Sequence, residues 1–334
     1  MIAADLETWF AKVKRPMPWR RRPSPYVCWL SEIMMQQTTY AAVLPYYERF
    51  LKRFPTVEKL AAADEADVLK AWEGLGYYAR ARNLLKAARL IVPDASSRRG
   101  AGKPGSAPAT RGRVGYGPAW PRTSAEWAAL PGVGPYTAAA LASVLNGERV
   151  PVVDGNVVRV FARVWKLNDD FSKQPNRAKL AARLQPEIDR CRVPGDFNQA
   201  MMELGATVCT PTSPTCGGCP LAEACAARKE GTQSDYPAKP MKKALPVRKV
   251  TAVVIKDAKG RVLLVQNREG GLLKGLWELP AIERTADVTQ VFSHFRLEQT
   301  NFRAFRSDAE FRDPKSVPLT TATRKALMGA ILIR

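Results

Sequence analysis

Two carboxylic acids stand in sequence contexts that predict different protonation states. Glu32 lies within residues 27–35, VCWLSEIMM, a helical stretch that is apolar nearly all round, so burial should raise its pKa and keep it protonated at neutral pH. Asp154 precedes an expected helix, and an N-cap aspartate accepts backbone hydrogen bonds and stays ionised. Such a pair suits cleavage of an N-glycosidic bond, because the acid protonates the leaving base while the anion stabilises the cationic sugar. A paired core acid and a plain helix cap are the alternative interpretations.

Four closely spaced cysteines form a candidate metal or cluster site. The pattern C-x6-C-x2-C-x5-C is made by Cys209, Cys216, Cys219 and Cys225. Disulfides are disfavoured in an intracellular protein, which leaves zinc or an iron–sulfur cluster, and spacing alone does not choose between the two. The other two cysteines, Cys28 and Cys191, have no partners nearby in the sequence, and we expect both to be buried free thiols.

Residues 130–134, LPGVG, form a Gly-x-Gly turn between two amphipathic segments. Gly132 and Gly134 would let the backbone approach a phosphate closely and leave N–H groups pointing outward at the start of the next helix. Such a hairpin holds a DNA strand without reading its sequence. An ordinary tight turn is the alternative.

The charge balance indicates a polyanionic partner. The chain has 52 Lys and Arg against 31 Asp and Glu, a net charge of +21, which favours binding through counterion release. Nucleic acid is the leading partner, since no basic amphipathic helix supports the alternative of a membrane surface. The single histidine, His294, argues against catalytic triads, His-rich zinc sites and His acid–base pairs, so carboxylates are expected to carry out proton transfer.

The elements that must position these residues are mainly helices. Ser24-Pro25 has the N-cap and first-turn proline of a helix start. The apolar periodicity predicts helices over residues 26–35, 39–54, 64–72, 77–92, 124–130, 136–145, 155–165 and 177–189.

Other segments depart from the helical pattern. Residues 95–122 hold six Gly, four Pro and six Arg or Lys but no acid, which predicts a disordered basic insert. The Pro- and Lys/Arg-containing stretch 232–248 indicates a linker. Beyond it, two β-branched runs at 249–256 and 261–266 flank a turn at Lys259-Gly260 and predict a hairpin. The chain is therefore expected to be mostly α, with a helical domain over 1–231 and a smaller α+β domain over 249–334.

Several segments together resemble MutY-type adenine DNA glycosylases, which belong to the helix–hairpin–helix superfamily shared with endonuclease III. In the family's order, they are residues 29–38 (WLSEIMMQQT), 74–80 (GLGYYAR), 130–134, 153–156 (VDGN) and the cysteine quartet. The resemblance covers most of residues 1–230 and extends more weakly to the C-terminus. It implies a helix–hairpin–helix glycosylase fold with a Nudix-like C-terminal domain.

The resemblance also implies roles for individual residues. Glu32 would protonate adenine and Asp154 would support the cationic sugar, with Asn156 beside it in the same motif. One 4Fe–4S cluster, rather than zinc, would be bound by the four cysteines. The positions that fill or wedge the duplex around the flipped base are matched by Gln37, Thr38, Leu75 and Tyr77. The start of the adenine pocket is matched by Trp19 and Arg20, with Glu203 as a weaker candidate.

The residue at position 136 distinguishes monofunctional from bifunctional glycosylases in this superfamily. Bifunctional members have a lysine two residues after the second glycine of the hairpin, where its amine attacks the sugar and the strand is later cut. Tyr136 cannot form the Schiff base, so the resemblance implies a monofunctional glycosylase. The phenol is then a candidate for hydrogen bonding near Asp154, and a packed aromatic at a helix start is the alternative.

The C-terminal domain is expected to read the opposite strand, because adenine itself is undamaged. It lacks the magnesium-binding signature of Nudix hydrolases after residue 280, which indicates binding rather than hydrolysis. Ser293 and His294, in the run FSHF, match the loop that contacts 8-oxoguanine in the family. Only residues 281–290 separate Pro280 from Val291, which directly precedes this run. The domain is therefore expected to be shortened, which weakens the case for 8-oxoguanine discrimination.

The expected function is removal of adenine mispaired with 8-oxoguanine or guanine in double-stranded DNA. The alternatives are an endonuclease III-like glycosylase for oxidised pyrimidines and a non-catalytic lesion-binding protein. The first residues lack a secretory pattern, and no apolar run approaches the roughly 20 residues that span a bilayer. We therefore expect a cytoplasmic, bacterial-type monomer that associates with the nucleoid when bound to DNA and does not bind membranes.

Overall fold

The computed structural model describes residues 2–92 and 118–238 and, further on, 251–252, 254–257, 259–268, 274–282, 287–291, 296–300, 309–320, 323–324 and 327. The chain divides into two compact units. The first unit contains Met1–Gln37 and Leu90–Lys243, and the second contains Thr38–Arg89 and Ala244–Arg334. Among the described residues, no helix is both long and apolar enough to cross a membrane.

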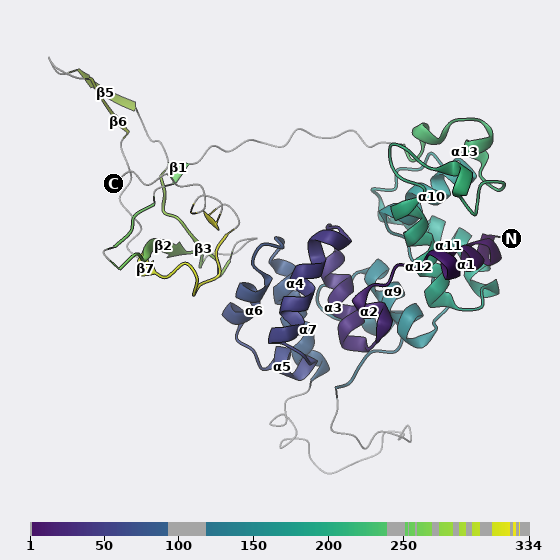
Figure 1. The fold of residues 1–334 in the computed structure, drawn as a ribbon, viewed down its shortest axis with the longest axis horizontal. Helices are drawn as coiled ribbons and strands as arrows, with labels where there is room; N and C mark the ends of the chain where they lie inside the picture. The colour runs from purple at the N-terminus through teal and green to yellow at the C-terminus, as the bar shows by residue number, and fades with distance from the viewer. Residues whose placement is uncertain are drawn as a thin grey trace, which may run out of the picture. The chain divides into compact units, whose positions relative to one another are not determined.

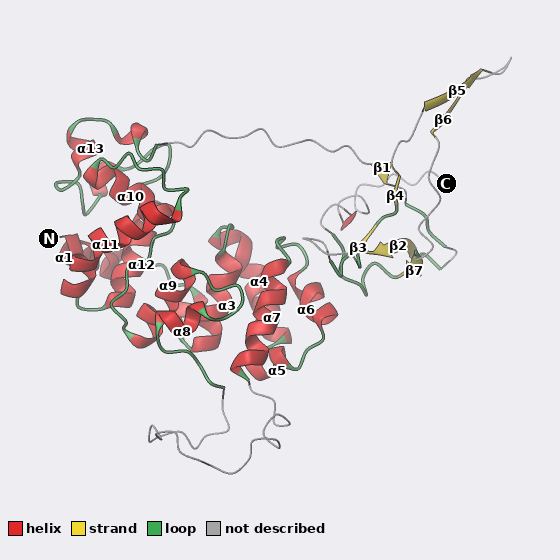
Figure 2. Cartoon of the chain, turned by 180° about the vertical axis from the view of Figure 1, so that it is seen from behind, coloured by secondary structure: helices red, strands yellow, loops and turns green. Residues whose placement is uncertain are grey.

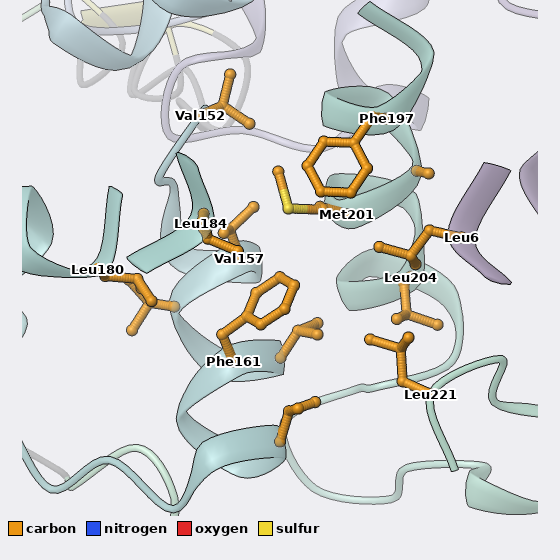
Figure 3. Close-up of a cluster of buried hydrophobic side chains, with 14 of the residues drawn as sticks. Leu6, Val152, Val157, Phe161, Leu180, Leu184, Phe197, Met201, Leu204 and Leu221 are labelled. Carbon is orange, nitrogen blue, oxygen red and sulfur yellow. The ribbon is translucent and has the colours of Figure 1, made fainter. Parts of the chain in front are cut away.

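The first unit is built from helices (Figure 1). They are α1 (Ile2–Val13), α2 (Pro18–Arg21), α3 (Pro25–Met35), α8 (Ser124–Ala128), α9 (Pro135–Asn146), α10 (Gly155–Trp165), α11 (Gln174–Arg190), α12 (Pro194–Thr207) and α13 (Ala226–Lys229), with short 3-10 turns at Cys216–Gly218 and Gln233–Asp235. In the core, α10 packs against α12 and α13, and α12 packs against α1 and α9. Figure 3 shows Phe161 of α10 among side chains of this core, which include Leu184, Met201, Leu204 and Leu221.

Local capping explains where several of these helices begin. Ser24 caps α3 by accepting the Val27 N–H, and Pro25 occupies the first turn, as predicted. Thr123 and Glu126 form a reciprocal capping box at the start of α8. The predicted helix over 155–165 is confirmed at both ends by α10.

The described part of the second unit contains helices and short strands, drawn in red and yellow in Figure 2. The helices are α4 (Tyr40–Arg53), α5 (Val57–Ala61), α6 (Glu65–Trp72) and α7 (Ala79–Ile91), whose last turn enters the first unit. Thr39 caps α4 and Thr56 caps α5 through their side-chain oxygens. Phe50 of α4 packs edge-on against Trp72 of α6, which fixes these helices against each other.

All strand pairs in the second unit are antiparallel. The strands are β1 (Thr251–Ala252), β2 (Val262–Gln266), β3 (Trp277–Glu278), β4 (Ala281–Ile282), β5 (Asp287–Val291), β6 (Arg296–Thr300) and β7 (Glu310–Arg312), in the orders β1-β4, β3-β2-β7 and β5-β6. The predicted hairpin is confirmed only next to its turn, where Lys256 bridges Val262. The strand formed by the first run, β1, pairs with β4. Val262, Leu264, Trp277, Leu279 and Leu319 form a small core, and the mostly α fold with a small C-terminal sheet is as predicted.

The two segments predicted as insert and linker are shorter than their composition suggested. Trp120 lies edge-on to Trp29 and packs against Trp127, and the Ala119 N–H bonds to the Ile91 carbonyl at 2.8 Å, so residues 118–122 belong to the packed helices. Residues 233–236, inside the predicted linker, also contact the helices, as described below. The remainder of the predicted insert up to 117 and of the linker from 239 lies outside the described residues.

Candidate active site and cysteine loop

Glu32 of α3 is held at the edge of the first unit's core. Its Oε2 accepts a hydrogen bond of 3.0 Å from the Tyr136 hydroxyl. The residue retains some exposed surface, but protein atoms surround its carboxyl closely, and desolvation raises its pKa to about 7. The Tyr136 bond and the Arg20 charge lower this pKa, whereas the Asp154 charge raises it. The predicted raised pKa of this acid is confirmed.

Tyr136 lies in the first turn of α9, the helix that directly follows the 130–134 hairpin. We expected its hydroxyl to bond near Asp154, but the hydroxyl donates to Glu32 instead and also lies 3.2 Å from the Met202 sulfur. Burial, followed by the charges of Glu32 and Asp154, raises the pKa of this phenol well above its usual range. Tyr136 therefore stays a neutral hydrogen-bond donor to the carboxyl group of Glu32.

Asp154 is the N-cap of α10, as predicted. Its Oδ1 accepts the Val157 N–H at 2.8 Å, and its Oδ2 accepts the Asn156 side-chain amide at 2.9 Å. Burial nevertheless raises the pKa of Asp154, while these hydrogen bonds and the charge of Arg159 lower it. The predicted cap is confirmed, and the ionised state of Asp154 stays a prediction, because burial and the hydrogen bonds act on its pKa in opposite directions. The two acids differ in their hydrogen-bond donors. The Asp154 carboxyl accepts bonds from two amide N–H groups, whereas the Glu32 carboxyl accepts a bond from a phenol hydroxyl.

A hydrogen-bond chain runs from Asp154 along α10 to the cysteine-bearing loop. Asn156, which donates to Asp154, accepts a bond of 2.7 Å from Arg159. Arg159 also donates to the Gly205 and Cys209 carbonyls, both at 2.7 Å. Gly205 is required for this contact, because a Cβ at that position would lie 2.5 Å from the Asn156 Cβ. The chain therefore ties the candidate catalytic acid to the backbone of the first cysteine.

The four predicted ligand cysteines line one cavity. Its wall also includes apolar side chains of α10 and α12 and of the loop, among them Val160, Leu204 and Leu221. Burial raises the pKa of the Cys219 thiol to about 11, and the other three thiols raise it further. No three His, Cys, Asp or Glu side chains in the described parts of the chain lie close enough together to hold a single metal ion. A cavity shared by four thiols is a place where a metal ion or a cluster would be bound.

Arg163 of α10 is hydrogen-bonded to the loop that carries the four cysteines. It is 2% exposed and donates to the carbonyls of Thr210, Pro211, Gln233 and Tyr236 over 2.8–3.1 Å. Its Nη1 also lies 3.3 Å from the Cys209 sulfur. One buried guanidinium therefore fastens both the start of the loop and the segment that follows it, which satisfies carbonyl oxygens that the irregular loop leaves unpaired.

The residues predicted to start the adenine pocket form a charged cluster on α2 and α12. Arg20 donates to Glu203 at 3.1 Å and to Gln199 at 2.7 Å, and Arg15 forms a second ion pair with Glu203. Glu203 is only 2% exposed, and Trp19 is also buried. The charge of Arg20 reaches Glu32, since it lowers the pKa of that acid. The predicted pocket residues thus lie in the same unit as the two acids, with their charges paired.

The 130–134 hairpin has the backbone that its glycines predict. Gly132 has a φ of 80°, and Gly134 caps α9 without a side-chain bond. The Gln36 side chain donates to the Gly132 carbonyl and to Thr137, which joins α3 to the hairpin. A groove opens beside the start of α9 and is also lined by Val150, Pro151, Val153 and Arg177.

The candidate duplex-contacting residues divide between the two units. Gln37 ends the first unit's leading segment with a φ of 58°, and Thr38 begins the second. Leu75 and Tyr77 lie between α6 and α7 in the second unit, where Tyr77 has a φ of 48° and is 59% exposed. Ser293 and His294 lie outside the described residues, so their predicted contact with 8-oxoguanine stays a prediction.

Arg159 and Arg163 are the functional residues that sequence reasoning missed. Both stand on α10 four positions apart, among seven apolar side chains, in the run GNVVRVFARVW. Arginine repeated at i and i+4 on so apolar a helix is the signal that could have identified them, because buried guanidinium groups need several acceptors.

The known proteins that this chain is similar to are DNA base excision repair proteins. The HhH-GPD superfamily base excision DNA repair protein family matches residues 30–186. The adenine DNA glycosylase of Homo sapiens is 34% identical over 331 residues, covering 83% of this chain, and that of Buchnera aphidicola subsp. Schizaphis graminum is 32% identical, covering 80%. The chain spans 57% of the length of the human protein and 70% of the Buchnera protein. A solved thermostable thymine-DNA glycosylase superposes with a TM-score of 0.54 at 26% identity, covering 68% of this chain and 95% of its own.

Proposed function

The chain belongs to the adenine DNA glycosylase family of the HhH-GPD superfamily, and from this premise we propose that it hydrolyses the N-glycosidic bond of adenine in duplex DNA. The observation that carries the proposal is the raised pKa of Glu32 in the same site as the capped carboxyl of Asp154. A carboxyl group with a pKa near 7 is protonated in a large fraction of molecules at neutral pH and is therefore able to donate a proton.

In the proposed reaction, Glu32 donates its proton to a ring nitrogen of the adenine as the bond to the sugar breaks. Asp154, oriented by Val157 and Asn156, places its carboxylate where it stabilises the positive charge that develops on the sugar. Water then adds to the sugar and gives up a proton to the Glu32 carboxylate, which leaves an abasic site and restores the acid. Tyr136 orients the Glu32 carboxyl and offers no amine for a Schiff base, so the strand is not cut by this enzyme.

Replacing Tyr136 with phenylalanine is expected to shift the pH dependence of adenine release. The rate should fall as pH rises through about 7 in the unmodified protein, because Glu32 then loses its proton. The Tyr136 hydrogen bond lowers the Glu32 pKa, so its loss should move this descending limb to higher pH by about one unit. Single-turnover rates from about pH 5 to about pH 9 measure the limb; an unmoved limb, or one displaced to lower pH, would contradict the assignment.

The proposed substrate is adenine opposite 8-oxoguanine or guanine. Because adenine is an undamaged base, the mispair has to be recognised through the opposite strand, and the family resemblance of residues 292–295 supports a role for the C-terminal region in that recognition. The net charge of +21 supports double-stranded DNA as the partner. We also propose a cytoplasmic monomer, as the sequence suggested.

The proposal is tested by offering duplexes with adenine opposite 8-oxoguanine, adenine opposite guanine, and thymine glycol side by side. We expect adenine release from the first two and no release of the oxidised pyrimidine. Release of thymine glycol with strand cutting would instead support an endonuclease III-like activity, and tight binding without release of any base would support a lesion-binding protein.

For the cofactor, we propose that Cys209, Cys216, Cys219 and Cys225 bind one 4Fe–4S cluster. The cavity lined by all four thiols and by apolar side chains supports this assignment, as does the family resemblance of the C-x6-C-x2-C-x5-C pattern. A bound cluster would cross-link four points of this loop and so stabilise it; no step of the proposed reaction passes through it.

A further inference from the structure

The turn between α6 and α7 presents an exposed aromatic ring on a constrained backbone. Gly74, Gly76 and Tyr77 in this 74–78 turn have φ values of 100°, 72° and 48°. Trp72 donates its indole N–H to the Gly76 carbonyl at 3.1 Å, and Arg80 donates to the Leu75 and Gly76 carbonyls at 3.3 Å. A projecting side chain on a backbone fixed in this way is suited to insertion between stacked bases of a duplex.

A segment from the C-terminal part of the second unit, residues 313–320, is docked on both sides of this turn. On the α6 side, the Lys70 ammonium donates to the Val317 carbonyl at 2.8 Å and to the Pro314 carbonyl at 3.3 Å. On the α7 side, the Tyr78 hydroxyl donates to the Leu319 carbonyl at 3.0 Å. Tyr78 is 3% exposed, so this hydrogen bond is shielded from water although its neighbour Tyr77 is exposed.

The 313–320 segment is itself part of the C-terminal sheet. The Trp277 N–H bonds to the Pro318 carbonyl at 2.8 Å, and the Thr320 N–H bonds to the Trp277 carbonyl at 3.0 Å. Leu319, between these bonds, is buried in the small core with Leu264. A continuous set of hydrogen bonds therefore joins strand β3 to the hydroxyl of Tyr78, one residue from the exposed ring.

We propose that the 313–320 segment sets the position of the 74–78 turn, so that Lys70 and Tyr78 are positioning residues for the displacement of the target base. The proposal rests on the proposed glycosylase function, because it assigns Leu75 and Tyr77 to the duplex. Through these contacts, the C-terminal sheet determines where the side chains of the turn meet the base stack. Loss of the contacts should impair displacement of the base but not the chemistry that follows.

The test compares the full chain with its Tyr78→Phe and Lys70→Met variants under single-turnover conditions. On a duplex with adenine opposite 8-oxoguanine, we expect each variant to release adenine at least about fivefold more slowly. Tyr78→Phe loses one shielded hydrogen bond, whereas Lys70→Met loses two bonds to the segment together with the Glu73 ion pair. The fluorescence rise of 2-aminopurine placed at the target position should slow by the same factor. Adenine opposite an abasic-site analogue, which is already poorly stacked, should be released within about twofold of the unmodified rate.

Arg89→Met is the matched control for Lys70→Met. Arg89 also donates to two carbonyls, those of Ala61 and Ala63, but these lie at the end of α5 and in the loop after it, away from the 313–320 segment. We expect this variant to retain the duplex rate, and equal slowing of both substrates in either test variant would overturn the positioning role. If one test variant fails to fold, the other decides the question. Inactivity of the unmodified protein on all adenine substrates would instead refute the proposed function.

Discussion

Glu32→Gln is expected to slow adenine release from a duplex with adenine opposite 8-oxoguanine by at least about 100-fold. Glutamine has nearly the same shape, so the Tyr136 hydroxyl still has an oxygen to donate to, but the amide cannot supply a proton to the leaving base. The loss should appear in the single-turnover rate rather than in duplex affinity, because Glu32 would act only as the bond breaks.

Glu7→Gln provides the control for a buried glutamate in the same unit. Glu7 of α1 accepts the backbone N–H groups of Arg192 and Val193 and is 9% exposed, yet it has no place in the proposed reaction. This variant should lose some stability and keep its rate per folded molecule. Retention by Glu32→Gln of more than about one tenth of the unmodified rate would remove Glu32 as the general acid.

Arg163→Met is expected to lower the free energy of unfolding of the first unit by more than about 3 kcal/mol. The methionine fills similar space but leaves the carbonyls of Thr210, Pro211, Gln233 and Tyr236 without their donor in a buried region. The loop that carries the four cysteines then loses its attachment to α10, so cluster content should fall with stability.

Two measurements on the same preparations check this expectation. The unmodified protein should contain about four iron and four acid-labile sulfide per chain, with absorbance near 400 nm, and the Arg163→Met variant much less. Arg183→Met is the control, because Arg183 is exposed and stacks on Trp165 without contacting the loop. A full iron content and an unchanged unfolding midpoint in Arg163→Met would show that the loop keeps its structure without the Arg163 hydrogen bonds. Zinc in place of iron would contradict the proposed cofactor.

Features that depend on neighbouring residues in the chain could be predicted from the sequence. The caps at Ser24 and Asp154 were found because a cap needs only a short side chain and a helix directly after it. Glu32 was recognised as buried because the apolar residues around it leave its helix no polar face. The fold class followed from the same local periodicity.

Contacts between distant residues could not be predicted in the same way. The hydroxyl of Tyr136 reaches Glu32 across 104 positions, and nothing near Tyr136 distinguishes that partner from Asp154. The pKa of Asp154 depends on how completely other helices bury it, which the N-cap pattern does not encode. Trp120 looked like part of a polar, glycine-rich stretch because its two tryptophan partners lie elsewhere in the sequence.

The hydrogen bond between the Ala119 N–H and the Ile91 carbonyl has a consequence for how this chain tolerates change in length. The chain leaves the helical unit and returns to it at a single point, so the helices are joined there regardless of how many residues intervene. Closing a loop of twice the length costs only about 0.6 kcal/mol more. A peptide or a reporter domain inserted between residues 92 and 118, with the chain on both sides kept, should therefore cost little stability, which makes this position suited to labelling or tethering the protein.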